Sequence, residues 1–151
     1  MEDQIQIISA NDLKKNDYLI INGRPCQITD LTYAKTGKHG GRKCHIKAVD
    51  IFRGRNQETA CNSGDNLDAP IVRKTSYDLI NLTSERQEDG STLWFCSLSA
   101  DGKVREDLKL PVDNKELSDV IVSRFEAGEN LILNVLSALK EEEIVSYTVS
   151  K

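Results

Sequence analysis

The chain has 151 residues, a formal net charge of −4 and 38% hydrophobic residues, which is the composition of a globular protein and allows one ordinary domain or two small ones. Its longest apolar run, residues 131–139, is interrupted by Asn134 and is too short to cross a bilayer. Residues 1–15 lack the basic and apolar regions of a secretory signal. These observations exclude a helical membrane protein, and we expect a cytoplasmic protein with no membrane partner.

Four cysteines are widely spaced and form no C-x-x-C pair, the spacing that zinc and redox sites use: Cys26, Cys44, Cys61 and Cys96. Most lie in apolar or alternating stretches, so we expect them to be reduced and buried. Cys44 and His45 are adjacent, but neighbours on a strand point to opposite faces, which argues against a catalytic pair.

The first half of the chain is predicted to be mostly β-strand. Asn22-Gly23 is a preferred pair for a tight hairpin turn, because both residues tolerate positive φ. The pattern of Cys44, Ile46 and Ala48 changes at Val49, which predicts a bulge or burial on both faces near that point. The expected strands are 18–21, 26–34, 44–52 and 57–61, followed by a polar loop at 62–70 and a domain boundary near Ile71.

The second half has three expected strands, one helix and two further strands. Asp113 and Glu116 resemble a capping box, and apolar residues recur at helical spacing until Gly128. The strands are expected at 77–83, 92–98, 104–110, 131–139 and 143–149. This order is that of a five-stranded OB barrel, a fold that often binds nucleic acid without establishing that function by itself.

Four aromatic residues of this half are candidates for stacking against bases: Tyr77, Trp94, Phe95 and Tyr147. Their strands carry no Lys or Arg to hold a nucleic-acid backbone alongside. Packing in the core is therefore the favoured role, and base stacking is the alternative.

Positive charge is concentrated in the first half. Residues 1–71 carry 10 basic against 9 acidic residues, whereas 72–151 carry 10 against 15. Residues 32–55 contain one acidic residue, Asp50, and seven basic residues: Lys35, Lys38, Arg42, Lys43, Lys47, Arg53 and Arg55. We expect this patch to dock on a polyanion, although an isolated charge run is also typical of a solvated hairpin.

The stretch "TYAKTGKHGGRKCHI", residues 32–46, does not match the known lysine chemistries well. A phosphate-binding loop needs Gly at the position of Thr32, Ser or Thr at the position of His39, and a following helix. A Schiff-base lysine needs burial or a neighbouring charge, and His39 with His45 lacks further metal ligands except Cys44. No second catalytic residue is evident either. The remaining interpretation is that Gly37, Gly40 and Gly41 let the chain turn so that the side chain of Lys38 is exposed to solvent.

The core of this stretch, "KTGKHG" at 35–40, resembles the hypusine-loop signature of the eukaryotic and archaeal translation factor 5A family. Further segments resemble the family in the expected order: "NGRPCQI" (22–28), "VDIF" (49–52), "VREDLKLP" (104–111) and "ILNVLSAL" (132–139). The chain departs from the usual family residues at Tyr33, Ala34, Gly41 and Arg42. The resemblance implies an all-β chain of two small barrels: an SH3-like barrel at 1–71 that carries the loop 35–42, and an OB-fold at 72–151.

The resemblance also implies a function. Deoxyhypusine synthase would transfer an aminobutyl group from spermidine to Lys38, with NAD as the synthase's own cofactor, and deoxyhypusine hydroxylase would complete hypusine. The loop residues that would support this modification are Lys35, Thr36, Gly37, His39 and Gly40. The chain itself would be no enzyme and would bind no cofactor, metal or small-molecule substrate.

In that family the modified arm acts on the ribosome in elongation and termination, reaching the peptidyl-tRNA and promoting peptide-bond formation at slow sequences such as consecutive prolines. The residues implied to contact rRNA or tRNA are Lys35, Lys38, His39, Arg42 and Lys43. The alternative is an RNA-binding adaptor of two barrels whose lysine stays unmodified.

Overall fold

The computed structural model describes residues 4–35 and 42–150, which divide into two compact units. The first contains Met1–Val72 together with Ala138–Lys140, and the second contains Arg73–Ser137 together with Glu141–Lys151. The domain boundary expected at Ile71 assigned 138–140 to the second half, whereas the structure groups this turn with the first unit.

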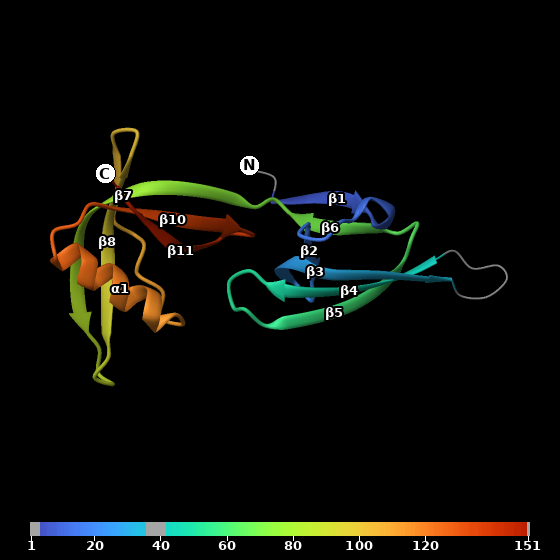
Figure 1. Ribbon diagram of the computed structural model, residues 1–151, viewed down its shortest axis with the longest axis horizontal. Coiled ribbons are helices and arrows are strands. Elements are labelled where there is room, and N and C mark those ends of the chain that lie inside the picture. The colour runs from blue at the N-terminus through green and yellow to red at the C-terminus, as the bar shows by residue number, and fades with distance from the viewer. Residues whose placement is uncertain (1–3, 36–41, 151) are drawn as a thin grey trace. The chain divides into compact units, whose positions relative to one another are not determined.

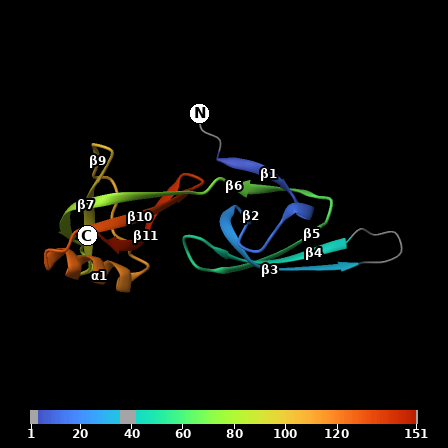
Figure 2. The same ribbon diagram turned by 45° about the horizontal axis from the view of Figure 1, so that its top comes forward.

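The first unit consists of strands and one short 3-10 helix (Figure 1). Its elements are β1 (Ile5–Ser9), η1 (Ala10–Asp12), β2 (Tyr18–Ile21), β3 (Arg24–Lys35), β4 (Arg42–Asp50), β5 (Asn56–Asn62) and β6 (Asn66–Pro70). Antiparallel pairing gives a four-stranded sheet in the order β2-β3-β4-β5 and a two-stranded sheet of β1 and β6. Figure 2 shows the β1–β6 pair lying across from β3 and β4. The core between them includes Ala10, Ile28, Cys44 and Ala69.

Local sequence explains the first hairpin. Ile21 pairs with Arg24 across a two-residue turn in which Asn22 and Gly23 have φ of 52° and 77°. Two residues with positive φ give the turn that matches strand twist, so the hairpin expected from this pair is confirmed.

Two features of this unit differ from the expectations. Residues 66–70 form β6 instead of a loop, because they pair with β1, a strand that its sequence did not signal. The bulge lies in β3, where the register shifts between Ile28 and Asp30, and β4 alternates regularly up to the buried Asp50. Alternating burial along β4 is thus preserved by an extra residue in its neighbour.

The second unit is a five-stranded antiparallel sheet with one helix among its described residues (Figure 1). Its elements are β7 (Arg73–Arg86), β8 (Thr92–Ala100), β9 (Lys103–Arg105), α1 (Lys115–Glu126), β10 (Leu131–Ala138) and β11 (Glu141–Val149). The strand order is β11-β10-β7-β8-β9. β7 changes from pairing with β10 to pairing with β8 at Asp78, and a register shift between Leu79 and Asn81 follows within the β7–β8 pairing. The all-β class and the helix between the third and fourth strands of the OB-fold are confirmed.

Strand β9 is shorter than expected. Regular pairing ends at Arg105, and the following residues pair with β8 in an isolated bridge between Phe95 and Lys109. Leu110 nevertheless donates its N–H to the carbonyl of Trp94. Residues 106–110 therefore stay beside β8 without forming a continuous strand.

The helix ends are set by two local signals. Its N-cap is Asn114, not Asp113: the Asn114 side chain accepts the N–H of Leu117 at 3.2 Å. At the other end Gly128 has φ of 89°, and the N–H groups of Gly128 and Glu129 return to the carbonyls of Phe125 and Arg124. This pattern is a Schellman motif, and it explains why the helix stops at the predicted glycine.

All four cysteines are buried and free, as expected. Ile121, Leu133 and Ile144 belong to the core of the second unit. None of the described helices has the length and apolar character needed to span a membrane.

Candidate functional site

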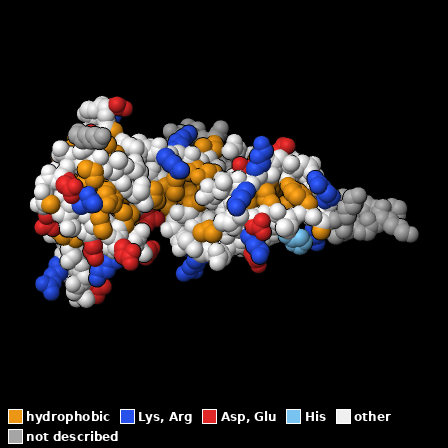
Figure 3. Space-filling model, viewed as in Figure 1, with side chains coloured by type: hydrophobic (Ala, Val, Ile, Leu, Met, Phe, Trp, Pro, Cys, Tyr) orange, Lys and Arg blue, Asp and Glu red, His pale blue; other side chains and the backbone are white. Residues whose placement is uncertain are grey.

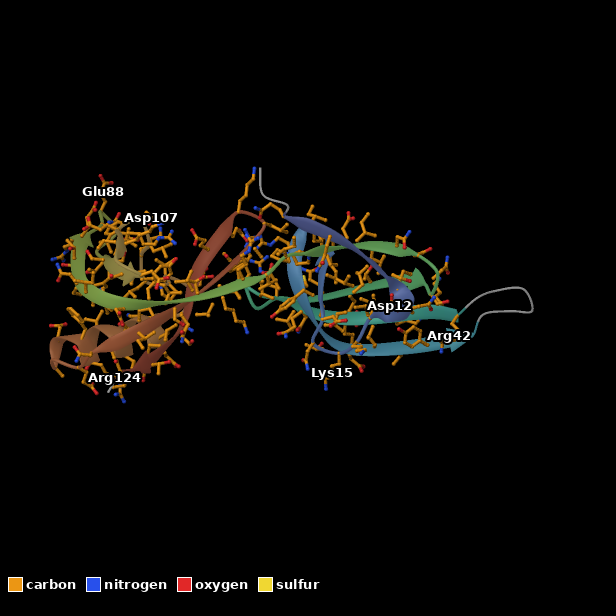
Figure 4. The ribbon with its side chains drawn as sticks, turned by 90° about the horizontal axis from the view of Figure 1, so that it is seen from above. Asp12, Lys15, Arg42, Glu88, Asp107 and Arg124 are labelled. Atoms are coloured by element: carbon orange, nitrogen blue, oxygen red, sulfur yellow. The ribbon has the colours of Figure 1, made fainter. Side chains whose placement is uncertain are left out.

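Strands β3 and β4 stay paired up to Lys35 and Arg42, so residues 36–41 connect two hydrogen-bonded strand ends. Of the predicted site residues, Lys35, Arg42 and Lys43 belong to these strands. The others lie outside the described residues: Thr36, Gly37, Lys38, His39 and Gly40, together with Gly41. Figure 4 labels Arg42 at the start of β4.

Arg42 and Lys43 point to opposite faces of the sheet, because side chains alternate along a strand. Arg42 shares the face of the buried Cys44, and its guanidinium carbon lies 4.6 Å from the centre of the Tyr33 ring. The Tyr33 hydroxyl donates a hydrogen bond to the carbonyl oxygen of Ala10 at 3.2 Å. The ring that contacts the guanidinium of Arg42 is thus fixed to η1 by a hydrogen bond.

The hydroxyl of Tyr33 remains protonated at physiological pH. Burial, and next the neighbouring Cys44, raise the pKa of Tyr33 above its ordinary value of 10.0, against the smaller opposite effect of Arg42. A neutral hydroxyl is a hydrogen-bond donor, which the carbonyl of Ala10 requires.

The opposite face of β4 carries Lys43, His45 and Lys47, all exposed. Lys47 lies beside two acids: it pairs with Glu58 at 3.9 Å and faces Asp30 in the register. Figure 3 shows this mixture of basic, acidic and histidine side chains on the surface of the first unit. Neither Arg42 nor Lys43 makes an ion pair with any carboxylate of residues 4–35 and 42–150, so the unpaired positive charge of β4 lies where this strand begins.

The seven basic residues of 32–55 do not form one patch, which corrects the expectation from the sequence. Arg53 and Arg55 belong to the β4–β5 turn, at the opposite end of β4 from Arg42. Eight residue steps separate Arg42 from Asp50, about 27 Å along a strand. Antiparallel pairing therefore divides charges that are close in sequence between two ends of the unit.

Three of the four aromatic candidates contribute to the core of the second unit, and Phe95 does not belong to that cluster. Tyr77, Trp94 and Tyr147 pack against the buried cluster. Arg105 lies over the ring of Tyr77 at 5.6 Å and Arg124 over that of Tyr147 at 5.5 Å. The packing of the three rings against the buried cluster supports core packing over base stacking.

Tyr33 is a residue of this site that sequence reasoning missed. The strand register could have identified it: when Lys35 pairs with Arg42, Tyr33 is the diagonal neighbour of Arg42 on the same face of the sheet. Across the described part of the chain, no three His, Cys, Asp or Glu side chains gather as a metal site.

Comparison with known proteins agrees with this architecture. A family model described as "Translation initiation factor 5A-like, N-terminal" matches residues 4–65, and one described as "Eukaryotic elongation factor 5A hypusine, DNA-binding OB fold" matches residues 71–148. A potato protein, eukaryotic translation initiation factor 5A-1/2 of Solanum tuberosum, is 41% identical over 135 residues, covering 89% of this chain and 79% of the relative.

Two solved structures are also similar. A translation initiation factor 5A family protein from Naegleria fowleri has a TM-score of 0.87 and 33% identity, covering 97% of this chain and 99% of that one. Translation initiation factor 5A from Methanococcus jannaschii, 19% identical with a TM-score of 0.69 and 96% coverage of both chains, shares the fold. Sequence and structure thus agree over nearly the whole length, and the chain belongs to the translation initiation factor 5A family.

Proposed function

We propose that this chain is an elongation and termination factor that binds the ribosome and peptidyl-tRNA and promotes peptide-bond formation at slow sequences such as consecutive prolines. The observation that carries the proposal is the position of Lys38. It stands within "KTGKHG", in a chain of the 5A family, on the segment that connects the paired strand ends Lys35 and Arg42. The proposed active group is hypusine, formed on this lysine.

The modification needs two partner enzymes. Deoxyhypusine synthase would break a C–N bond of spermidine, join the aminobutyl carbon to Nζ of Lys38 and release the three-carbon diamine, with NAD carrying the hydride on the synthase. Deoxyhypusine hydroxylase would then convert one C–H bond of the added chain to C–OH, with dioxygen as the oxidant and two further electrons supplied on that enzyme to reduce the second oxygen atom to water. The immediate neighbours Lys35, Thr36, Gly37, His39 and Gly40 would form the segment that the synthase recognises.

The factor would act by positioning and not by covalent catalysis. Holding two reactants in a near-attack geometry lowers a barrier by up to about 7 to 11 kcal/mol, without any bond to the group that positions them. A longer arm with two cationic amines can contact the acceptor end of a peptidyl-tRNA while the ribosome carries out the reaction. The protein would thus be a cytoplasmic accessory factor that binds no cofactor of its own.

Docking on RNA would use the basic residues beside this arm. Arg42 and Lys43 lie on opposite faces at the start of β4 without carboxylate partners among the described residues, and Lys35 precedes the segment. Contacts of such residues with phosphates release counterions, so ribosome association should weaken steeply as salt increases. Replacing Lys35, Arg42 and Lys43 together by Glu should abolish association at physiological salt; unchanged association would show that another surface docks.

Two measurements test the modification. Intact-mass analysis of the protein from its native cells should show the added aminobutyl and hydroxyl groups, located on Lys38. The variant Lys38→Arg keeps the positive charge but cannot accept the aminobutyl group, so it should lose stimulation of proline-proline synthesis with an unchanged melting temperature.

The alternative is an unmodified RNA-binding adaptor, favoured only by the basic strand end. In that case Lys38→Arg should retain full function, because charge is retained and surface substitutions change stability by no more than about 0.5 kcal/mol. Full stimulation by Lys38→Arg would therefore refute the hypusine mechanism.

A further inference from the structure

We propose that Tyr33 and Arg42 form a stacking platform for one unpaired base of single-stranded RNA. The guanidinium would lie between two aromatic planes, the Tyr33 ring on one side and the base on the other. This inference rests on the proposed RNA-binding function of the first unit, and it adds a base contact to what would otherwise be only phosphate contacts.

The platform is built on two described side chains and one backbone carbonyl, from three elements. Tyr33 comes from β3, Arg42 from β4, and the carbonyl of Ala10 from η1 accepts the Tyr33 hydroxyl. Ala10 is fully buried and Tyr33 packs against the same core, so the ring is held by packing and by its hydroxyl. In Figure 4, η1 (labelled at Asp12) and Arg42 lie toward the same end of the first unit.

Anchoring changes what Arg42 can do. A free arginine side chain loses about 2 kcal/mol of rotamer entropy when a ligand fixes it, whereas a guanidinium already stacked on a ring loses less. Arg42 is exposed and makes no ion pair with a carboxylate of the described residues. The Tyr33 ring therefore lies on one side of the guanidinium, and the platform would use the other side for a planar ligand.

The chemistry of this surface favours an unstacked base over other planar groups. Guanidinium planes and aromatic rings are the groups on which proteins stack the bases of single-stranded RNA. The stacked guanidinium keeps its N–H groups at the edge of the plane, where they can reach a phosphate of the same strand. Lys43 follows Arg42 on the opposite face of β4, so an RNA strand that passes this end of the sheet meets a second cation.

The test uses the complete chain and two single-stranded RNA hexamers with equal charge. One carries 2-aminopurine, whose fluorescence is quenched by stacking, and the other replaces that base by an abasic site. The native protein should quench the fluorescence and bind the base-containing hexamer about tenfold more tightly than the abasic one, as expected for one stacked base.

Four variants separate stacking from charge. Arg42→Lys and Tyr33→Leu should each remove the tenfold preference, and the double variant should lose no more than either alone, because both residues serve one contact. Tyr33→Phe keeps the ring and should retain most of the preference. Lys43→Ala is the matched charge control: it should weaken binding of both hexamers equally and lower the slope of the salt dependence by about 1.

Several results would overturn the platform. These are equal binding of the two hexamers by the native protein, native base preference in Arg42→Lys, or no binding of either hexamer at physiological salt. Competition by a poly-glutamate peptide as strong as that by RNA would assign the surface to an acidic protein partner instead.

The outcome is distinguishable from failure of the proposed function. The hexamers require neither hypusine nor a ribosome, so Lys38→Arg should retain the base preference while losing stimulation of translation. Loss of stimulation without any base preference in the native protein would leave the function standing and remove the platform.

Discussion

Asp50 is a buried carboxylate that organises the β4–β5 turn, and we predict that its removal destabilises the first unit. Its side chain is 1% exposed. It accepts the Nε–H of Arg24 at 2.8 Å, a second guanidinium N–H at 3.3 Å, and the backbone N–H groups of Phe52 and Arg53 at 2.9 and 3.0 Å. Asp50→Ala leaves all four donors without this acceptor.

The expected loss in free energy of unfolding is about 3 kcal/mol. Breaking a fully buried ion pair costs about 3 to 5 kcal/mol, because the remaining charge is left uncompensated. Arg24 is 20% exposed, so water compensates part of that charge and the lower end of the range applies. The matched control is Asp68→Ala, an exposed carboxylate of β6, which should change stability by no more than about 0.5 kcal/mol.

The two units allow an internal control in the assay. Trp94 is the chain's only tryptophan and belongs to the second unit, so its fluorescence reports on that unit. Amide hydrogen exchange of β3 and β4 reports on the first. Asp50→Ala should accelerate exchange of the slowest β4 amides by about 100-fold or more, since 1.4 kcal/mol corresponds to a factor of ten.

The pH dependence gives a second check on the same residue. Burial alone would raise the pKa of Asp50, but the hydrogen bonds of Arg24, Phe52 and Arg53 together outweigh it and hold the pKa below the ordinary value of 3.8. A carboxylate with a lowered folded-state pKa stabilises the fold above that ordinary value, and the stabilisation disappears as pH falls through the folded-state pKa. The gap between native protein and Asp50→Ala should therefore narrow below about pH 4. A constant gap, or exchange as slow as in Asp68→Ala, would refute the reasoning.

Two further predictions concern the second unit. Arg105, at the end of β9, donates hydrogen bonds of 2.9 and 3.0 Å to Glu142 of β11 and so connects the two edge strands of the sheet. Arg105→Met should therefore lower the free energy of unfolding of the second unit by about 2 kcal/mol. Urea titrations followed by Trp94 fluorescence measure this change. An effect as small as that of the exposed neighbour variant Lys103→Met would contradict this role. Gly128→Ala should lower the free energy of unfolding by about 1 to 2 kcal/mol, because Gly128 has φ of 89°, where a Cβ strains the backbone. An added Cβ meets no atom within 4 Å, so backbone strain is the only expected cause. Gly64→Ala, where φ is not in that region and space is equally open, should cost only a few tenths of a kcal/mol; equal losses at both glycines would exclude the backbone explanation.

Errors in predicting the strands came where pairing partners are distant. Residues 66–70 are polar and end in proline, and their own sequence indicates a loop. They form β6 because β1, some 60 residues earlier, supplies its hydrogen-bonding partner in a fixed register. Pro70 is compatible with this pairing because it stands opposite Ile5, between the pairs that exchange hydrogen bonds. A propensity read from neighbouring residues contains no information about such a partner.

The helix cap shows the same limit at shorter range. Asp113 and Asn114 are both good N-caps, and only the backbone path decides which side chain reaches a free N–H. The structure selects Asn114, whose oxygen accepts the N–H of Leu117.

For the candidate site, the sequence by itself determined the residue types and their order: a lysine within "KTGKHG" and basic residues on both sides. The turns and the periodicity of the chain also predicted two β-rich units. These features are local, because glycine conformations, alternating burial and a family motif depend on adjacent residues. Only the tertiary structure decided which cations remain together. Strand pairing places Arg53 and Arg55 at the far end of β4 from Arg42. It also places Arg42 over the ring of Tyr33, whose hydroxyl donates a hydrogen bond to the carbonyl of Ala10. The physical reason is that register and burial join residues distant in sequence, and the face on which a side chain lies depends on the strand beside it.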